Sequence, residues 1–344
     1  MLDYLVVGQG LAGTLISYQL YLRNLSFLVV DEENASSSSI IAAGIIDPIT
    51  SRRNGKVWMI DEVLPEADQQ YKALENLLSI EFFNKISLIK PFANQEEANS
   101  FIIIDEIRDF IQSRLPQDPS IGTPYGGLKV EGALLHSAKL VLAWRSFLKG
   151  EKHFWNEKFD CAQLKIFNEH VEYKGESAKQ VIFCEGYKAA LENPYFSYLP
   201  FWLAKGEILD IETQIALSEG IFYKSIFVMP VGGNNYRIGP TFERNVLDEI
   251  PSEEGKREIL SKFEKIFEAP VRVIAHKAAI RPTVKDRRPM LGRHPKYRNL
   301  SVFNGLGTKG VMLAPYFSKH FLDHLEHQTP LSREVDIRRF EQKP

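Results

Sequence analysis

The chain begins with two short blocks of hydrophobic residues, and the segment between them has a helical pattern. Residues 4–7 are almost entirely apolar, as in a strand buried on both faces of a parallel sheet. A helical pattern follows, with Leu15 and Leu22 on one face. A second apolar block, residues 27–30, ends at Asp31. This order predicts a strand, a helix and a second strand packed together as a βαβ unit.

The turn between the first strand and the helix reads GxGxxG over residues 8–13. Gly8 permits a tight turn, Gly10 lets the backbone approach a pyrophosphate, and Gly13 allows close packing of helix and strand. The helix N-terminus offers N–H groups to phosphates, and Asp31 is placed to accept hydrogen bonds from ribose hydroxyls. The pattern predicts a dinucleotide site and disfavours NADP. The alternative is a glycine turn that binds nothing.

Three later segments bear on which dinucleotide is bound. Four serines at residues 36–39 precede a run of small and apolar residues, which would let a flat ligand approach; composition alone favours a flexible polar loop. Residues 181–186 form an apolar strand ending in glycine. Residues 303–315 form a glycine-rich loop entering a helix, with Pro315 expected in the first turn. This second loop favours FAD over NAD, because a simple NAD fold needs no second loop there. A helix N-terminus at this place could stabilise negative charge on a reduced flavin.

Composition narrows the class of protein. The 344 residues carry 42 Lys and Arg against 44 Asp and Glu, so a net charge of −2 gives no field for polyanions, and no nucleic-acid partner is expected. The two cysteines, Cys161 and Cys184, are too few for a disulfide framework and suit a reducing compartment. No cluster suggests a metal, and no apolar run approaches the roughly 20 residues that span a bilayer. We expect a cytoplasmic protein.

The chain resembles the D-amino acid oxidase family of flavoenzymes. The resemblance is carried by the GxGxxG unit, by residues 42–44 (AAG), and by residues 279–295 and 310–315, which look like glycine oxidase. It implies an α/β fold with a discontinuous, Rossmann-like FAD-binding domain of the glutathione reductase type. A second, mostly antiparallel β domain would hold the substrate.

The resemblance also implies domain boundaries. The FAD-binding domain would comprise residues 1–80, 134–200 and 281–344, and the substrate domain residues 81–133 and 201–280. Within the substrate domain we expect a turn at residues 205–207 near its start. A hairpin is expected around residues 232–235, whose GGNN sequence suits a tight connection.

The resemblance assigns the site residues. Arg281 falls where glycine oxidase places its carboxylate-binding arginine, and a planar guanidinium can hold a carboxylate bidentately. The alternative is a surface arginine in a proline-rich turn. Lys309 would stabilise the reduced flavin, so Arg281 and Lys309 are the predicted catalytic residues. The residues predicted to bind FAD are Gly8, Gly10, Leu11, Ala12, Gly13, Asp31, Glu32, Ser38, Ala42, Ala43, Gly44, Cys184, Glu185, Gly186, Gly305, Gly307, Thr308, Lys309, Gly310 and Val311.

The implied activity is oxidation of the C–N bond of a small amine or amino acid. A hydride would pass to flavin N5, the imine would hydrolyse, and oxygen or another acceptor would reoxidise the flavin. FAD is expected to be non-covalent, because no cysteine lies beyond Cys184 where the sarcosine oxidase branch has its tether. Thr308 replaces a second basic anchor and Phe227 an expected tyrosine, so the substrate cannot be carried over.

Three alternatives stay open at this point. Residues 238–244 and 308–310 also resemble the oxidase half of a bifunctional enzyme that trims a modified uridine in tRNA. A flavin-binding protein without amine turnover is a second alternative. An NAD-dependent dehydrogenase is a third. The oligomeric state is not predicted.

Overall fold

A computed structural model describes residues 1–344 except 51–54, 218 and 342–344. The predicted βαβ unit is present: β1 (Leu2–Val7) and β2 (Phe27–Asp31) pair in parallel, and α1 (Leu11–Leu22) connects them. They belong to a first sheet of order β16-β17-β10-β1-β2-β7, in which β8 and β9 extend from β10. Its other strands are β7 (Phe154–Asn156), β8 (Leu164–Ile166), β9 (Val171–Tyr173), β10 (Glu176–Phe183), β16 (Met290–Arg293) and β17 (Leu300–Asn304).

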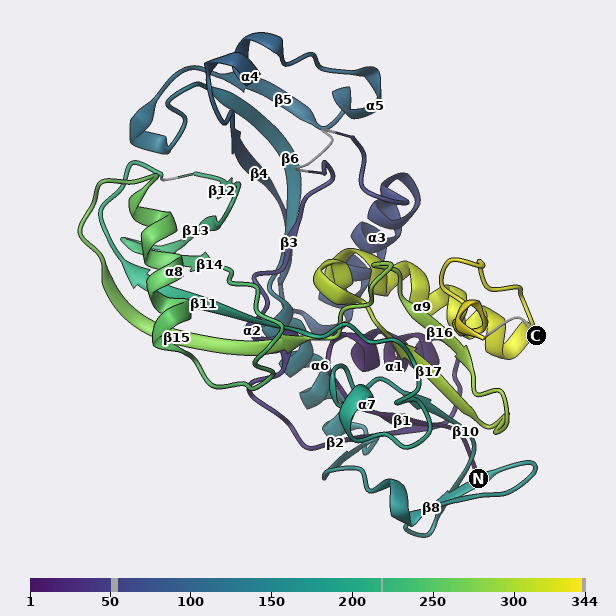
Figure 1. Cartoon of the computed structure of the whole chain (residues 1–344). Helices are drawn as coiled ribbons and strands as arrows, with labels where there is room; N and C mark the ends of the chain where they lie inside the picture. Colours follow the sequence, from purple (N-terminus) through teal and green to yellow (C-terminus); the bar gives the residue numbers. More distant parts are fainter. Residues whose placement is uncertain (51–54, 218, 342–344) are drawn as a thin grey trace.

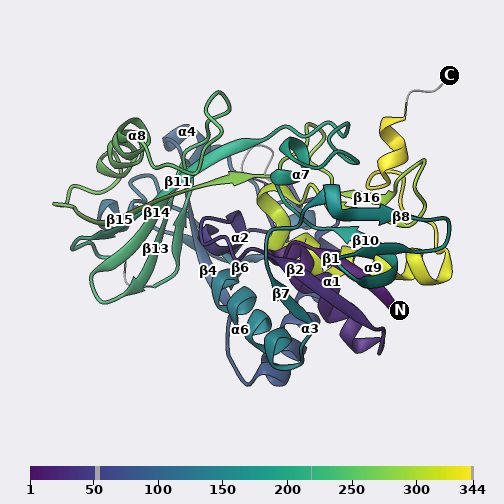
Figure 2. The ribbon, with the colours of Figure 1, turned by 90° about the horizontal axis from the view of Figure 1, so that it is seen from below.

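A second, mostly antiparallel sheet has the order β15-β11-β14-β13-β12-β4-β6-β3, with β5 paired to β6. Its strands are β3 (Ile45–Ile46), β4 (Phe83–Pro91), β5 (Ile111–Leu115), β6 (Gly127–Leu135), β11 (Ala204–Glu212), β12 (Ile221–Tyr223), β13 (Phe227–Gly232), β14 (Asn235–Gly239) and β15 (Arg272–Arg281). The two sheets occupy different halves of the molecule (Figures 1 and 2). The mixed α/β fold with an antiparallel second sheet confirms the predicted fold class.

Long helices cover one face of the first sheet. They are α3 (Ile60–Leu78), α6 (Ser137–Gly150) and α9 (Gly310–His327), and they pack with α1 into one core. Trp144, Phe317 and Phe321 are fully buried there, each removing roughly 150–250 Å² from water. Ala314 and Leu325 of α9 belong to the same core, so one side of this helix is apolar along its length. Leu22 is half-exposed, contrary to the pattern, because it is the last residue of α1.

The remaining helical elements are short, apart from α8, and lie in the connections. They are α2 (Ser38–Ile41), α4 (Gln95–Ser100), α5 (Asp105–Arg108), α7 (Lys188–Leu191), α8 (Glu253–Glu264) and the 3₁₀ turns η1 (Pro119–Ile121), η2 (Cys161–Gln163), η3 (Gly307–Lys309) and η4 (Ile337–Phe340). The serine-rich segment is therefore partly helical, and the expectation of a flexible polar loop is wrong there: the Leu11 amide donates to the Ser39 hydroxyl at 2.9 Å, which ties the segment to α1.

Pro315 is in the sixth position of α9, so the expectation of a first-turn proline is wrong. A proline removes the hydrogen bond to the carbonyl four residues earlier, here that of Val311. The Tyr71 hydroxyl, from α3, donates to that carbonyl at 2.6 Å. Because a tertiary contact replaces the lost bond, the helix continues through the proline.

Residues 205–207 belong to β11, so the predicted turn is wrong. The two charged side chains of this segment, Lys205 and Glu207, are buried and paired. Lys205 donates to Asp248 at 2.6 Å, and Glu207 accepts from the Ser252 amide and hydroxyl at 2.9 and 2.8 Å. The predicted hairpin is confirmed, since β13 and β14 pair through the glycine-rich turn.

Candidate functional site

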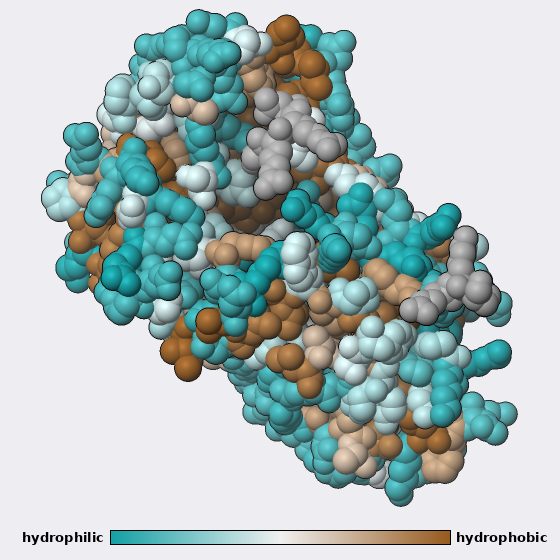
Figure 3. Space-filling model, in the orientation of Figure 1, coloured by the Kyte–Doolittle hydropathy of each residue, from teal (hydrophilic) through white to brown (hydrophobic). Residues whose placement is uncertain are grey.

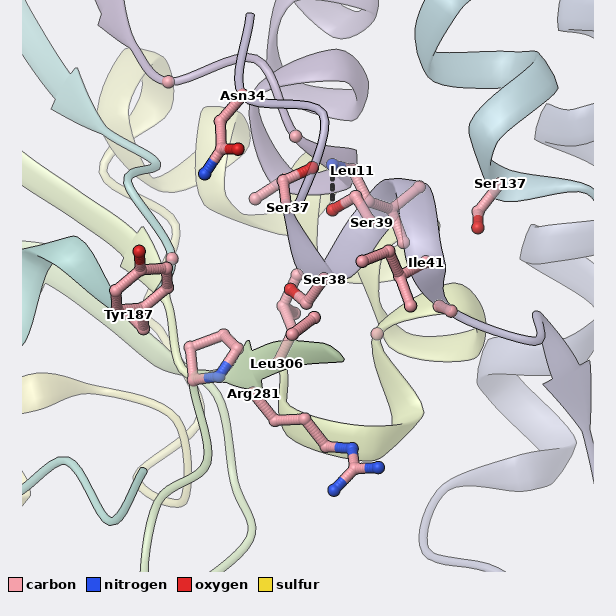
Figure 4. A pocket seen from close by; sticks show the side chains of 18 of the residues that line it. Leu11, Asn34, Ser37, Ser38, Ser39, Ile41, Ser137, Tyr187, Arg281 and Leu306 are labelled. Carbon is pink, nitrogen blue, oxygen red and sulfur yellow. Dashed lines mark hydrogen bonds between the residues drawn. The ribbon is translucent and has the colours of Figure 1, made fainter. Parts of the chain in front are cut away.

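One cavity of about 470 Å³ runs from the GxGxxG turn to the second sheet, and Figure 4 shows residues that line it. The predicted residues that line it are Gly8, Gly10, Leu11, Ala12, Asp31, Glu32, Ser38, Ala42, Ala43, Gly44, Cys184, Glu185, Gly186, Arg281, Gly307, Thr308, Gly310 and Val311. Segments far apart in the chain therefore meet there. Gly13, Gly305 and Lys309 are not among the lining residues.

The glycine turn is built for close backbone packing. Gly8 has φ +92°, and a Cβ there would lie 2.7 Å from the Cys184 carbonyl oxygen of the neighbouring strand end. A Cβ on Gly13 would collide with the Gly8 carbonyl, so Gly13 permits the turn without facing the cavity. α1 begins directly after Gly10 with no side-chain cap, which leaves its N-terminus facing the cavity.

Acidic residues at the end of β2 lie on the cavity wall. The Asp31 carboxylate accepts from the Gln9 and Glu33 amides at 2.7 and 2.8 Å, and the Arg145 guanidinium is 3.3 Å away. The side chain is thus fixed beside the glycine turn. Glu32 forms an ion pair with Lys188 of α7 across the cavity rim. A ribose contact by either residue stays a prediction.

A partly buried carboxyl, that of Glu185, follows β10 at the cavity. Burial raises the pKa of Glu185 to about 7, and the Asn193 amide donates to it at 2.6 Å. The preceding thiol, Cys184, is also buried, and burial raises its pKa well above the usual range. This thiol is therefore protonated and serves as a small apolar wall.

These features fit a bound dinucleotide. The backbone turn admits only glycine at residues 8 and 13 without a collision. The N-terminus of α1, whose Leu11 amide is bonded to the Ser39 hydroxyl, borders the free space beside the turn. The opposite wall is formed by residues 42–44 and 307–311 except Lys309, which supply small side chains and backbone to a flat ring. The residues present would hold FAD along the cavity.

Arg281 is the last residue of β15 and faces the cavity from the second sheet (Figure 4). Its Nη2 donates to the Thr241 carbonyl at 3.2 Å, and burial lowers its pKa to about 10. No carboxylate lies within 4.0 Å of its guanidinium in the part of the chain that the structure describes. The alternative of a surface arginine in a turn is wrong, because strand pairing to β11 holds it beside the cavity.

The cavity around Arg281 has walls that the sequence alone did not identify. Ile208, Tyr223, Phe242 and Ala279 come from the second sheet and its connections, and Phe227 lies among them. Tyr223 is directly opposite Phe227 in the β12–β13 pair, and burial raises its pKa to about 12. The sequence signal for Tyr223 was the alternation of faces along β12. Phe222, the residue before it, is buried in the apolar core, so Tyr223 points to the other face of the sheet.

Lys309 lies beside the cavity without lining it. The residue as a whole is exposed, although its ammonium is partly desolvated, while Thr308 and Gly310 on either side line the cavity. Desolvation lowers its pKa, opposed by the charge of Asp47. Its predicted action on a reduced flavin stays a prediction.

The described residues contain neither a metal-binding cluster nor a membrane-spanning helix. Among the described residues, no group of three or more His, Cys, Asp or Glu side chains could hold a metal ion. None of the helices in these residues has the length and apolar character needed to cross a bilayer. Both cysteines are free thiols.

Comparison with known proteins identifies the family. The profile of the DAO family, described as "FAD dependent oxidoreductase", matches residues 3–323, and the chain belongs to this family. It is therefore an FAD-dependent oxidoreductase, which confirms the resemblance and the cofactor drawn from the sequence. The NAD-dependent dehydrogenase considered above is excluded by the same match.

Curated relatives are distant. Glycine oxidase of Bacillus subtilis (strain 168) is 25% identical over 189 residues, covering 50% of this chain and 49% of that protein. The tRNA 5-methylaminomethyl-2-thiouridine biosynthesis bifunctional protein MnmC of Idiomarina loihiensis is 25% identical over 153 residues, covering 41% of this chain and 25% of that protein. The chain thus spans about half the length of the glycine oxidase that it matches and about a quarter of the length of the bifunctional protein.

Solved structures share the fold over almost the whole chain. Iminodiacetate oxidase from Chelativorans sp. BNC1 superposes with a TM-score of 0.80 at 18% identity, covering 97% of this chain and 98% of that one. Glycine oxidase from Bacillus cereus ATCC 14579 has a TM-score of 0.78 at 18% identity, covering 96% of each chain. These likenesses define the architecture.

Proposed function

We propose that this protein oxidises the C–N bond of a small amine that carries a carboxylate, as in an amino acid. The observation that carries the proposal is the guanidinium of Arg281. It faces the cavity, it is largely buried, and no carboxylate of the described residues neutralises it. A buried charge costs several kcal/mol unless it is paired, and a ligand carboxylate would supply the pair.

The chain's own residues would bind and orient the substrate. Nη1 and Nη2 of Arg281 donate to the Lys205 and Thr241 carbonyls at 3.5 and 3.2 Å, which fixes the plane of the guanidinium. Its remaining N–H groups would hold the substrate carboxylate. Ile208, Phe227 and Ala279 exclude water around the carbon to be oxidised. Bound FAD supplies the hydride acceptor, and the resulting imine would hydrolyse in water.

No general base is required if the amine arrives neutral. Tyr223 brings a hydroxyl from the second sheet to the cavity wall, and burial, which raises its pKa to about 12, keeps that hydroxyl protonated at neutral pH. It would therefore act as a hydrogen-bond donor to substrate oxygen or accept from the amine. Oxygen and other electron acceptors are both compatible with this arrangement. We also propose a cytoplasmic location, on the two free cysteines.

The anaerobic spectrum tests the proposal. The FAD-loaded protein is mixed with glycine, sarcosine, proline and a panel of D- and L-amino acids, and bleaching of the flavin bands is followed. Admitting air afterwards separates an oxidase from a dehydrogenase. We expect one group of carboxylate-bearing amines to bleach the flavin. Bleaching by modified nucleosides alone would favour the tRNA alternative, and no bleaching by any amine would favour a flavin protein without turnover.

The variant Arg281→Ala separates binding from cofactor loading. Loss of the charge pair should weaken carboxylate-bearing substrates by about 2–5 kcal/mol while FAD stays bound. Arg281→Lys keeps the charge but not the bidentate geometry, so its affinity for these substrates should lie between those of the wild type and Arg281→Ala. Amino acid kinetics that are unchanged in Arg281→Ala would contradict the proposal.

A further inference from the structure

Phe242 is an exposed aromatic residue on the cavity wall. It is 53% exposed, yet it lines the same cavity as Arg281. The Arg281 guanidinium lies 5.7 Å from the centre of its ring. An exposed apolar side chain is common and needs no explanation by itself, but an aromatic ring on the wall of the cavity that Arg281 also lines is placed to contact a ligand.

The backbone on both sides of Phe242 is fastened to β11. The Thr241 amide donates to the Glu207 carbonyl at 3.1 Å. Lys205 and Glu243 exchange two amide–carbonyl bonds of 2.7 and 3.0 Å. These bonds fix the Phe242 Cα beside the cavity.

A stack of side chains fixes the ring itself. The Arg244 guanidinium lies 3.2 Å from the centre of the Trp202 ring and 4.7 Å from that of Phe242. Its Nη1 also donates to the Trp202 carbonyl at 3.2 Å. The Phe242 ring therefore lies near two guanidinium groups, that of Arg244 at 4.7 Å and that of Arg281 at 5.7 Å. On the face in Figure 3, hydrophobic residues reach the surface between the two halves of the molecule.

Charge is scarce in this part of the cavity. The other charged residues lining it are Asp31, Glu32, Lys158, Glu185, Lys188 and Glu192, all from the segments around the first sheet. Among the described residues of the second sheet and its connections, Arg281 is the charged side chain that lines the cavity, beside Ile208 and Phe227. No second cation and no anion of the described residues lines this wall, since Arg244, which lies on the Trp202 ring and near Phe242, is not among the lining residues.

We propose that Phe242 is a specificity-determining residue and that the substrate carries an apolar group, aliphatic or aromatic, next to its carboxylate. This inference rests on the proposed function, because Arg281 would place the carboxylate. With the carboxylate on Arg281, an apolar substituent would lie against Phe242, Ile208 and Phe227 and remove these surfaces from water. Glycine and dicarboxylic amines would use the site less well.

Binding of simple carboxylates tests the inference without turnover. Acetate and phenylacetate are titrated into the FAD-loaded protein, and the perturbation of the flavin absorbance gives each Kd. We expect phenylacetate to bind at least about tenfold more tightly than acetate. Phe242→Ala should remove most of that preference and leave the acetate Kd within about twofold, whereas Phe242→Leu should keep most of it.

Phe167→Ala is the matched control. Phe167 is 44% exposed, comes directly after β8, and does not line the cavity, so this variant should keep the wild-type preference. Equal affinity for the two probes in the wild type, or an intact preference in Phe242→Ala, would overturn the inference alone. Acetate binding that survives in Arg281→Ala, or no binding of either probe to the flavin-loaded protein, would instead contradict the proposed function on which it rests.

Discussion

The guanidinium of Arg281 lies directly against the backbone of Gly206. A Cβ built on Gly206 would collide with the guanidinium carbon and both of its terminal nitrogens. The two residues face each other because β11 and β15 pair antiparallel, with Gly206 opposite Ala279. The position of the proposed carboxylate anchor thus depends on the absence of a side chain on the adjacent strand.

Gly206→Ala should therefore weaken carboxylate binding without removing FAD. The new methyl would push the guanidinium away from the Thr241 carbonyl, and overpacking of this kind costs typically about 1–3 kcal/mol. The Kd of a carboxylate probe, from flavin absorbance, checks the effect on binding, and the ratio of flavin to protein checks loading. A variant with wild-type affinity for the probe would show that Arg281 does not hold it.

Gly13→Ala should impair both folding and FAD binding. Here the collision is with the Gly8 carbonyl, which is backbone and cannot rotate away. Gly150→Ala is the control, since Gly150 ends α6 with no atom within 4 Å of its would-be Cβ. Urea unfolding should show a loss for Gly13→Ala, and no loss or a gain of up to about 1 kcal/mol for Gly150→Ala. Equal stability of the two variants would contradict the packing argument.

Glu185 should make the apoprotein less stable as the pH rises. Burial raises its pKa from 4.5 to about 7, so the folded state keeps a proton that the unfolded state has lost. Its contribution to stability is complete below about pH 4.5 and is lost as the pH rises through 7. Glu185→Gln, neutral throughout, should reduce the decline between pH 5 and 8 by on the order of 1–3 kcal/mol. If the free energies of urea unfolding of the wild type and of Glu185→Gln fell in parallel with rising pH, this expectation would be refuted.

The buried ion pair of Asp47 and Lys90 should be sensitive to removal of either partner. The carboxylate and ammonium are 2.7 Å apart, with side chains 11% and 13% exposed. Lys90→Met leaves a buried carboxylate without its cation, which typically costs about 3–5 kcal/mol. The double variant Asp47→Asn, Lys90→Met should recover much of that loss. Chemical denaturation measures both, and a single variant as stable as the wild type would contradict the expectation.

The part of the site that the sequence could predict is the part encoded locally. Gly8 and Gly13 are required by the turn itself, whatever the rest of the chain does, and Asp31 follows a strand whose apolar run is unmistakable. The resemblance then located Arg281. Each of these positions is identified by its neighbours in the chain.

The walls of the cavity could not be predicted in the same way. Phe242 and Ile208 reach the cavity through the pairing of strands that are distant in sequence, and alternation along a strand separates two faces without saying which one faces a cavity. The expectation that Pro315 lies in the first turn of its helix failed for a related reason. The local rule puts proline in a first turn, whereas the hydroxyl of Tyr71 satisfies the carbonyl that the proline leaves free.

The strand order of the first sheet also constrains when the protein can acquire its cofactor during synthesis. β1, which carries the glycine turn, pairs with β10 on one side, and β17 lies beyond β10. When the glycine turn of a nascent chain has left the ribosome, the strand β10 beside it is still missing until residues 176–183 emerge. The cavity wall formed by residues 307–311 is missing for longer still. With these segments as the proposed walls of the FAD site, we expect cofactor loading to follow translation of nearly the entire chain, and a product stalled before β17 to retain flavin poorly.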